Sequence, residues 1–210
     1  MSDILEQMQK DIYSGKVDEV RAATEKALAE GLSAQEVLND GLVAGMDEVG
    51  RDFKAGILFI PEVLLCARAM HAGLGVLRPL LAESGALAMG KVVIGTVTGD
   101  LHDIGKNLVG MMLQGAGFEI IDLGTDVSPE QFVAAVREGA DLVGMSALLT
   151  TTMPAMKTTM EALIEAGLRD SVKVLIGGAP VTAGFAEKIG ADGYAPDAAA
   201  AVDSVRSLIA

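Results

Sequence analysis

The first part of the chain carries apolar side chains at helical spacing and shows no convincing strand pattern. Apolar positions recur every three or four residues over 2–13 and again over 17–30. Gly15 and Gly31 follow these two runs, where glycine commonly ends a helix. The pattern therefore predicts two helices joined by a short turn.

Two further helices are predicted before residue 85. Ser33-Ala-Gln-Glu36 is a capping-box sequence, which predicts a helix running to about Phe53. Pro61 suits the first turn of a fourth helix, which we expect to end just before Pro79. Four helices with short connections predict a small antiparallel bundle.

Beyond residue 90 the pattern changes to short β-branched runs that alternate with helical segments. The predicted strands are 91–98, 118–123, 142–146, 172–176 and 192–194. The predicted helices are 103–115, a segment opening at Ser128-Pro129, 154–166, 181–189 and 198–208. This alternation requires right-handed crossovers and a parallel sheet with helices on both faces. The predicted fold is a four-helix cap followed by a doubly wound, flavodoxin- or Rossmann-like sheet of five parallel strands.

The boundary between the two patterns is rich in small residues. The stretch 81–90, LAESGALAMG, has the composition of a turn or hinge. We therefore predict a helical cap domain over 1–84, a linker over 85–90 and an α/β domain over 91–210.

Composition and charge narrow the classes of function. Half of the 210 residues are apolar and 21% are charged, which excludes an intrinsically disordered chain. The net charge of −13 disfavours a nucleic-acid partner, because Lys and Arg that neutralise phosphates drive that binding. No signal peptide and no uninterrupted apolar run long enough for a membrane span are visible, so we expect a cytoplasmic protein without a membrane partner.

Candidate chemistry lies in the loop after the first predicted strand, because ligands bind beyond the carboxyl ends of such strands. Residues two apart in an extended segment project to the same side, so Asp100 and His102 can meet. A carboxylate that binds one imidazole nitrogen leaves the other for a metal. The alternative is that His102 is an ordinary loop histidine and Asp103 a helix cap. Gly105 lets a large group pass close to the backbone.

A conventional zinc site is disfavoured, because it needs three or four ligands from His, Cys and carboxylates. Cys66 is the only cysteine, and His71 is the only other histidine. A metal held by His102 must therefore arrive with most of its ligands already supplied, as cobalt does in a corrin ring.

Three motifs together resemble the cobalamin-binding signature of methionine synthase, corrinoid methyltransferase proteins and adenosylcobalamin mutases. They are Asp100-x-His102-x-x-Gly105, Ser146-x-Leu148 and Gly177-Gly178. The resemblance covers essentially the whole chain, and the layout is most similar to the corrinoid proteins of methylamine and methanol methyltransferase systems. Taken alone, Gly177-Gly178 would be interpreted as an ordinary strand-to-helix turn.

The resemblance implies a role for each matching residue. His102 would bind cobalt from below in place of the cofactor's own base, and Asp100 would bind the other ring nitrogen. Thr152 matches a relay hydroxyl that is Ser in the methionine synthases. The path of the nucleotide tail would be lined by Gly105, Ser146, Leu148, Gly177 and Gly178, with Thr150 and the Tyr194–Ala195 turn nearby. Asp103, next to His102, is also a candidate cofactor-binding residue.

In the predicted cap, Phe59 and Leu65 are candidates for apolar contacts that shield a cobalt-bound methyl group. The alternative is that both belong to the core of the bundle. Cys66 is interpreted as a buried small hydrophobic residue, and His71 as a surface or interdomain residue.

The function implied by the resemblance is that of a corrinoid protein carrying a methyl group between two methyltransferases. The cofactor would be cobalamin or a related corrinoid, cycling between cob(I)alamin and methylcob(III)alamin. The implied partners are a substrate-specific corrinoid methyltransferase, a second methyltransferase acting on tetrahydrofolate or a thiol such as coenzyme M, and a reductive activase. No nucleophile or general base for substrate chemistry is visible, which indicates a carrier without a complete active site of its own.

Two alternatives remain open from the sequence. One is a cobalamin-binding sensor that regulates transcription, which normally carries an additional DNA-binding domain. The other is the small subunit of an adenosylcobalamin mutase, which typically lacks the helical cap. The upper ligand of the cofactor distinguishes them, since a carrier holds methyl or water and a mutase or photosensor holds adenosyl.

Overall fold

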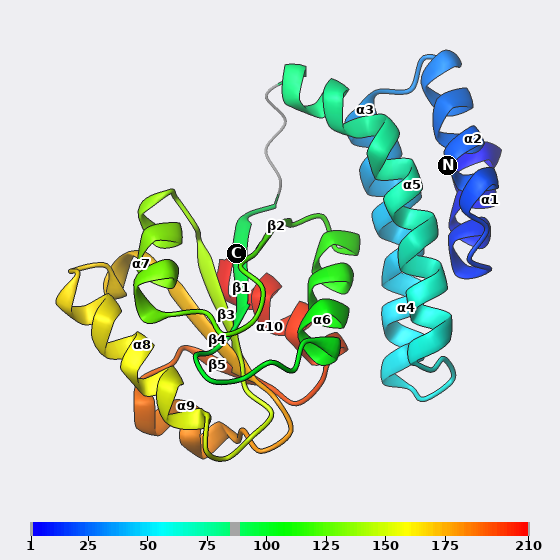
Figure 1. The fold of residues 1–210 in the computed structure, drawn as a ribbon. Coiled ribbons are helices and arrows are strands. Elements are labelled where there is room, and N and C mark those ends of the chain that lie inside the picture. The colour runs from blue at the N-terminus through cyan, green and yellow to red at the C-terminus, as the bar shows by residue number, and fades with distance from the viewer. Residues whose placement is uncertain (1, 85–88, 210) are drawn as a thin grey trace. The chain divides into compact units, whose positions relative to one another are not determined.

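A computed structural model describes residues 2–84 and 89–209 (Figure 1). The chain falls into two compact units, one holding residues up to 88 with 114–117, the other holding 89–113 and 118–210. Residues 85–88 of the predicted linker lie outside the described residues. The domain boundaries expected from the sequence therefore stay a prediction.

The first unit is a bundle of helical segments, as the apolar spacing predicts. Its elements are α1 (Asp3–Tyr13), α2 (Val17–Ala29), α3 (Ala34–Glu36), η1 (Val37–Val43), α4 (Ala44–Lys54) and α5 (Ile60–Ser84). Helix α1 packs against α2 and α4, and both of these pack against α5, which closes a four-sided arrangement. The core of the bundle includes the fully buried side chains Met8, Ile12, Val20, Leu42, Met70 and Leu77.

The third helical segment contains a feature that the spacing does not predict. It opens with the expected capping box of Ser33 and Glu36 and continues to Lys54, but its turns over Val37–Val43 are π-helical. Gly41 lies in this π-helical stretch, where a Cβ would come 2.7 Å from Met8 Sδ of α1. Helix α1 therefore approaches the π-helical turns closely.

The prediction that the fourth helix ends before Pro79 is wrong. Helix α5 begins at Ile60 and continues through Pro79 to Ser84, so the turn expected over 81–84 is also helical. Proline removes one backbone hydrogen bond, but its fixed φ of about −65° is itself helical. Leu77, two residues earlier, is fully buried in the bundle. The helix therefore continues in spite of the missing N–H.

Helix α5 is also the one helix in the described part of the chain that is long and apolar enough, over Ile60–Leu81, to cross a membrane by length and composition. Val63, Met70 and Leu77 on this helix are at most 1% exposed. Burial in the core of the bundle thus accounts for one apolar face of α5, while Leu65 on the same helix is half exposed.

The second unit is a five-stranded parallel sheet, as predicted. Its strands are β1 (Lys91–Thr96), β2 (Glu119–Asp122), β3 (Leu142–Ser146), β4 (Lys173–Gly177) and β5 (Gly193–Ala195). Its helices are α6 (Ile104–Gly115), α7 (Pro129–Arg137), α8 (Met153–Glu165), the 3₁₀ turn η2 (Arg169–Ser171), α9 (Ala183–Ile189) and α10 (Ala198–Ile209). The strand order is β2-β1-β3-β4-β5, and every neighbouring pair is parallel.

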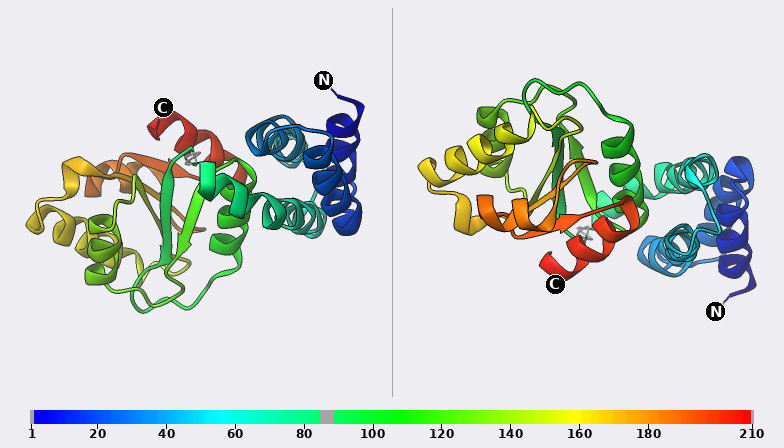
Figure 2. Two further views of the ribbon diagram at one scale, coloured as in Figure 1. Left: turned by 90° about the horizontal axis from the view of Figure 1, so that it is seen from above. Right: turned by 90° about the horizontal axis from the view of Figure 1, so that it is seen from below.

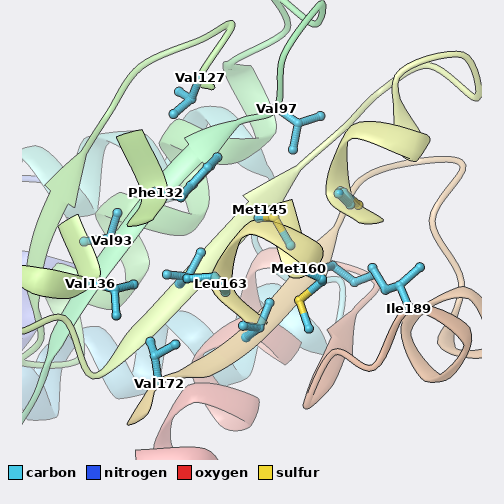
Figure 3. Close-up of a cluster of buried hydrophobic side chains, with 14 of the residues drawn as sticks. Val93, Val97, Val127, Phe132, Val136, Met145, Met160, Leu163, Val172 and Ile189 are labelled. Atoms are coloured by element: carbon cyan, nitrogen blue, oxygen red, sulfur yellow. The ribbon is translucent and has the colours of Figure 1, made fainter. Parts of the chain in front are cut away.

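Helices cover both faces of this sheet (Figure 2). Side chains of α7, α8 and α9 pack with β1, β3 and β4 on one face, in a cluster that includes the fully buried Phe132 (Figure 3). On the other face, α6 packs against β1 through Gly110 and Ile94, and α10 packs against β4 and β5. The fold is therefore doubly wound.

The strand order decides where a ligand can bind. The chain leaves β1 towards β2 on one side and returns to β3 on the other, which makes β1 and β3 the switch point of the flavodoxin-like order. Thr96 at the end of β1 pairs with Ser146 of β3, and Ser146 pairs with Gly177 of β4. The loops that carry the three sequence motifs therefore emerge side by side at one edge of the sheet.

The two neighbouring residues Leu163 and Ile164 test the placement of α8. Leu163 is fully buried and Ile164 is 60% exposed. We expect Leu163→Ala to lower the free energy of unfolding by about 2–5 kcal/mol, through lost burial and the cavity left behind. Ile164→Ala is the matched control and should change it by at most about 0.5 kcal/mol. Urea denaturation measures both, and equal losses would contradict this orientation of α8.

Candidate functional site

The Asp100 carboxylate is the centre of the site at this edge of the sheet. The residue is only 1% exposed. Its Oδ1 accepts a hydrogen bond from the backbone N–H of His102 at 3.1 Å and lies 2.8 Å from His102 Nδ1. The expected contact between the two side chains is therefore present.

The second oxygen of Asp100 is bound by the loop between β3 and α8. Oδ2 accepts from the backbone N–H groups of Leu148 at 2.8 Å and Leu149 at 3.3 Å. The hydroxyl of Thr152 lies 2.7 Å from the same oxygen. The structure thus brings the predicted Leu148 and Thr152 to Asp100, and a threonine in place of serine still reaches the carboxylate.

These contacts determine the charge of Asp100. Burial opposes ionisation, but the hydrogen bonds from Thr152, from the side chain and backbone of His102 and from the backbone of Leu148 outweigh it. Together they hold the pKa of the Asp100 carboxyl well below its usual range. Asp100 is therefore ionised at neutral pH.

The ionised carboxylate selects one tautomer of His102. A carboxylate is only an acceptor, so the 2.8 Å contact requires that His102 Nδ1 carries a proton. In the neutral ring this leaves the lone pair on Nε2, the arrangement found where histidines bind metals. The side chain of His102 is 51% exposed, so the ring is accessible to a ligand from solution.

Among the apolar residues around His102, only Leu148 was singled out from the sequence. Leu101 and Ile104 lie within the motif, on either side of His102, and are 72% and 78% exposed. Leu148 and Leu149 in the neighbouring loop are 42% and 43% exposed. Exposed apolar clusters of this kind mark binding surfaces. The signal in the sequence is the presence of bulky apolar residues in loops, where they are not needed to fill a hydrophobic core.

The predicted glycines differ in what surrounds the position of a Cβ atom. Nothing lies within 4 Å of the position that a Cβ on Gly105 would occupy, so the start of α6 is open to a bulky group. Gly178 has φ of +127°, and a Cβ there would lie 1.9 Å from the carbonyl oxygen of Ala147. Gly178 is therefore required by the close approach of the β3–α8 and β4–α9 loops. A Cβ on Gly177 would lie 3.0 Å from Ala195 O.

The remaining predicted residues of the α/β unit lie at or near the same edge of the sheet. Asp103 precedes α6, and its carboxylate accepts from the Asn107 side chain at 3.0 Å. Ser146 is half-buried at the end of β3, and Thr150 is exposed in the following loop. Tyr194 is half-buried in β5, where it pairs with Ile176 of β4.

In the helical unit, Phe59 and Leu65 are 64% and 50% exposed. The alternative that they belong to the bundle core is therefore wrong. Cys66 is buried as expected, and burial raises the pKa of its thiol to about 11. His71 is half-buried, and burial together with the nearby Arg78 charge lowers its pKa.

The arrangement suits a metal that brings its own equatorial ligands. Among the described residues, no group of three or more His, Cys, Asp or Glu side chains could hold a bare metal ion. The site instead offers one oriented nitrogen of His102, open space beside Gly105 and exposed apolar side chains around them. These features fit a large planar cofactor with a metal at its centre.

Comparison with known protein families assigns both units. A B12 binding domain matches residues 90–203, and a second B12 binding domain model matches residues 4–78. The first match contains every candidate site residue of the α/β unit, and the second contains Phe59 and Leu65.

Relatives match the chain over its full length. Dimethylamine corrinoid protein 1 of Methanosarcina acetivorans is 48% identical over 99% of this chain and 98% of its own. A cobalamin-binding protein from Desulfitobacterium hafniense has a TM-score of 0.81 at 32% identity, covering 100% of both chains. A chain of the methanol:cobalamin methyltransferase complex MtaBC from Methanosarcina barkeri has a TM-score of 0.88 at 32% identity, covering 99% of this chain and 80% of that one. The chain therefore belongs to the B12-binding corrinoid protein family.

Proposed function

We propose that this protein carries a methyl group on a corrinoid between methyltransferases. The observation that supports this most strongly is the buried, ionised Asp100 that orients His102 at the switch point of a B12 binding domain. The full-length similarity to a dimethylamine corrinoid protein favours a carrier over a sensor or a mutase subunit.

The residues around Asp100 have separate tasks in this proposal. His102 would hold the cobalt of the corrinoid through Nε2, because Asp100 holds the proton on Nδ1. Thr152 and the Leu148 backbone stabilise the charge of Asp100 and fix its orientation. A protein ligand held in this way positions the cofactor and tunes its metal.

The open start of α6 receives the nucleotide tail of the corrinoid. Gly105 leaves space beside the helix, and the exposed apolar side chains of Leu101 and Ile104 would contact the ring. The other residues proposed along this path are Ser146, Leu148, Thr150, Gly177, Gly178 and Tyr194. In the helical unit, the exposed side chains of Phe59 and Leu65 would supply apolar contacts to the cofactor.

The bound cobalt supplies the nucleophile that accepts the methyl group and the leaving group that releases it. We propose a substrate-specific methyltransferase as the donor partner, as the methanol:cobalamin methyltransferase complex of a relative suggests. A second methyltransferase, acting on tetrahydrofolate or a thiol such as coenzyme M, and a reductive activase complete the set of cytoplasmic partners.

Loading and transfer experiments test this function directly. The purified protein is loaded with aquocobalamin, reduced with titanium(III) citrate and mixed with candidate methyltransferases and dimethylamine or methanol. We expect the visible spectrum to change from the reduced to the methylated cofactor with one donor pair. Failure to bind aquocobalamin would contradict the proposal. If adenosylcobalamin were the only cofactor with which the protein is competent, a mutase subunit would be favoured instead.

Asp100→Asn tests the orientation of His102. Asparagine retains one acceptor oxygen, and the three donors at Oδ2 compete for it, so its NH₂ group faces His102 Nδ1. The proton then moves to Nε2, and we expect affinity for cobalt to fall about 10- to 100-fold. Electron paramagnetic resonance of the cob(II) form with nitrogen-15 histidine measures the ligation.

The matched control is Asp141→Asn, which changes a carboxylate that accepts from the backbone N–H of Lys91 at 2.7 Å, away from the cofactor loop. Histidine coupling should persist in this control. Unchanged coupling in Asp100→Asn itself would show that the carboxylate does not orient the ligand.

Gly105→Leu tests the path of the nucleotide tail. Nothing lies within 4 Å of a Cβ at Gly105, and leucine is a good helix former, so the cofactor-free protein should be at least as stable as the wild type. Affinity for aquocobalamin should fall at least about tenfold, because the side chain fills the space of the tail. Gly184→Leu in α9, also in open space, is the control. Equal binding by both variants would exclude this path.

A further inference from the structure

The loop between β2 and α7 continues the pairing of the sheet beyond the strands, alongside the loop that carries His102. The backbone N–H of Thr96 donates to Gly124 O at 3.0 Å, and that of Val127 donates to Thr96 O at 2.9 Å. Val97 and Val127 form a further parallel bridge. The β2–α7 loop is therefore bonded to the backbone that leads into the cofactor motif.

Asp126 makes the last two contacts of this series. Its Oδ1 accepts from the backbone N–H of Gly99 at 2.7 Å, and its own N–H donates to the carbonyl oxygen of Asp100 at 3.0 Å. One residue thus binds the backbone N–H of Gly99 and the backbone carbonyl of Asp100, at the two ends of the Gly99–Asp100 segment. Asp126 does not touch His102, Thr152 or either oxygen of the Asp100 carboxylate in these contacts.

Asp126 also has an uncommon backbone conformation. Its φ is +55°, and among the described residues it is the only non-glycine with a positive φ. Glycine adopts this region without steric cost, whereas aspartate tolerates it only moderately. A glycine would satisfy the turn, but it could not accept the hydrogen bond from Gly99. Side chains held in strained conformations cluster at functional sites.

We infer that Asp126 is a positioning residue for the Asp100–His102 pair. It fixes the backbone of Gly99 and Asp100, and thereby directs the Asp100 carboxylate towards His102 on one oxygen and the β3–α8 loop on the other. This inference rests on the proposed function, because its importance lies in the ligand that His102 supplies. It adds a second loop to the support of the axial ligand.

Three substitutions separate the side chain from the turn. Asp126→Gly relieves the strained conformation and removes the acceptor for Gly99. Asp126→Asn keeps an acceptor oxygen and a residue that tolerates positive φ. Asp126→Ala removes the acceptor and keeps the strain. Asp126→Gly is the decisive variant, because it should fold at least as readily as the wild type.

Asp141 offers a matched control at the opposite edge of the sheet. Its Oδ2 accepts from the backbone N–H of Lys91 at 2.7 Å, and its own N–H donates to Lys91 O at 2.8 Å. Asp141→Gly therefore removes the same kind of side-chain acceptor, and leaves the backbone contact in place, at the opposite end of the strand from the cofactor loop.

The first measurement uses the cofactor-free protein. Hydrogen exchange of the Gly99 amide, followed by nuclear magnetic resonance, should accelerate at least about tenfold in Asp126→Gly and Asp126→Ala, because the acceptor is lost. Exchange in Asp126→Asn and Asp141→Gly should stay close to the wild type. Unchanged exchange of Gly99 in Asp126→Gly would overturn the inference without affecting the proposed function.

The second measurement uses protein labelled with nitrogen-15 histidine, which is loaded with aquocobalamin and then reduced to the cob(II) form. We expect Asp126→Gly to lose about tenfold in affinity and to weaken the histidine coupling, and Asp126→Asn to restore both. Wild-type coupling in Asp126→Gly, or an equal loss in Asp141→Gly, would overturn the positioning role. Absence of histidine coupling in the wild type would overturn the proposed function and this inference together.

Discussion

The site depends on one buried charge, the carboxylate of Asp100, which must be satisfied by the protein because water does not reach it. An isolated buried carboxylate is costly, and the cost is offset only when hydrogen-bond donors surround it. Here the donors come from its own loop and from the loop after β3, some 48 residues further along the chain. The same contacts that keep Asp100 ionised also hold the two loops together.

The two neighbouring loops support the His102 loop in different ways. The β3–α8 loop binds the side chain of Asp100 through backbone N–H groups and Thr152. The β2–α7 loop binds the main chain on both sides of Asp100 through Asp126. Because one contact set orients the carboxylate and the other fixes its backbone, the histidine ring has little freedom to change its direction. Rigid support of this kind is what a metal ligand requires.

The surface of the site has the opposite character from its interior. Leu101 and Ile104 expose large apolar side chains beside the half-exposed His102. This exposure does not by itself stabilise the folded chain. In the bundle, Phe59 and Leu65 are exposed in the same way. Such surfaces are stabilising only when a ligand or partner covers them. Both units of this B12-binding protein therefore retain apolar surface that the fold alone does not use.

The sequence by itself determined the order and type of nearly all elements, because apolar spacing reports which face of a helix or strand is buried. It also determined the contact of Asp100 with His102, because residues two apart in an extended loop are neighbours whatever the fold. It failed at Pro79 and at the π-helical turns, where packing of the bundle overrides local preference. The roles of Leu149 and Asp126 were decided only by the tertiary structure. Their contacts depend on the parallel register and strand order, which bring distant loops to one edge of the sheet and which no local pattern encodes.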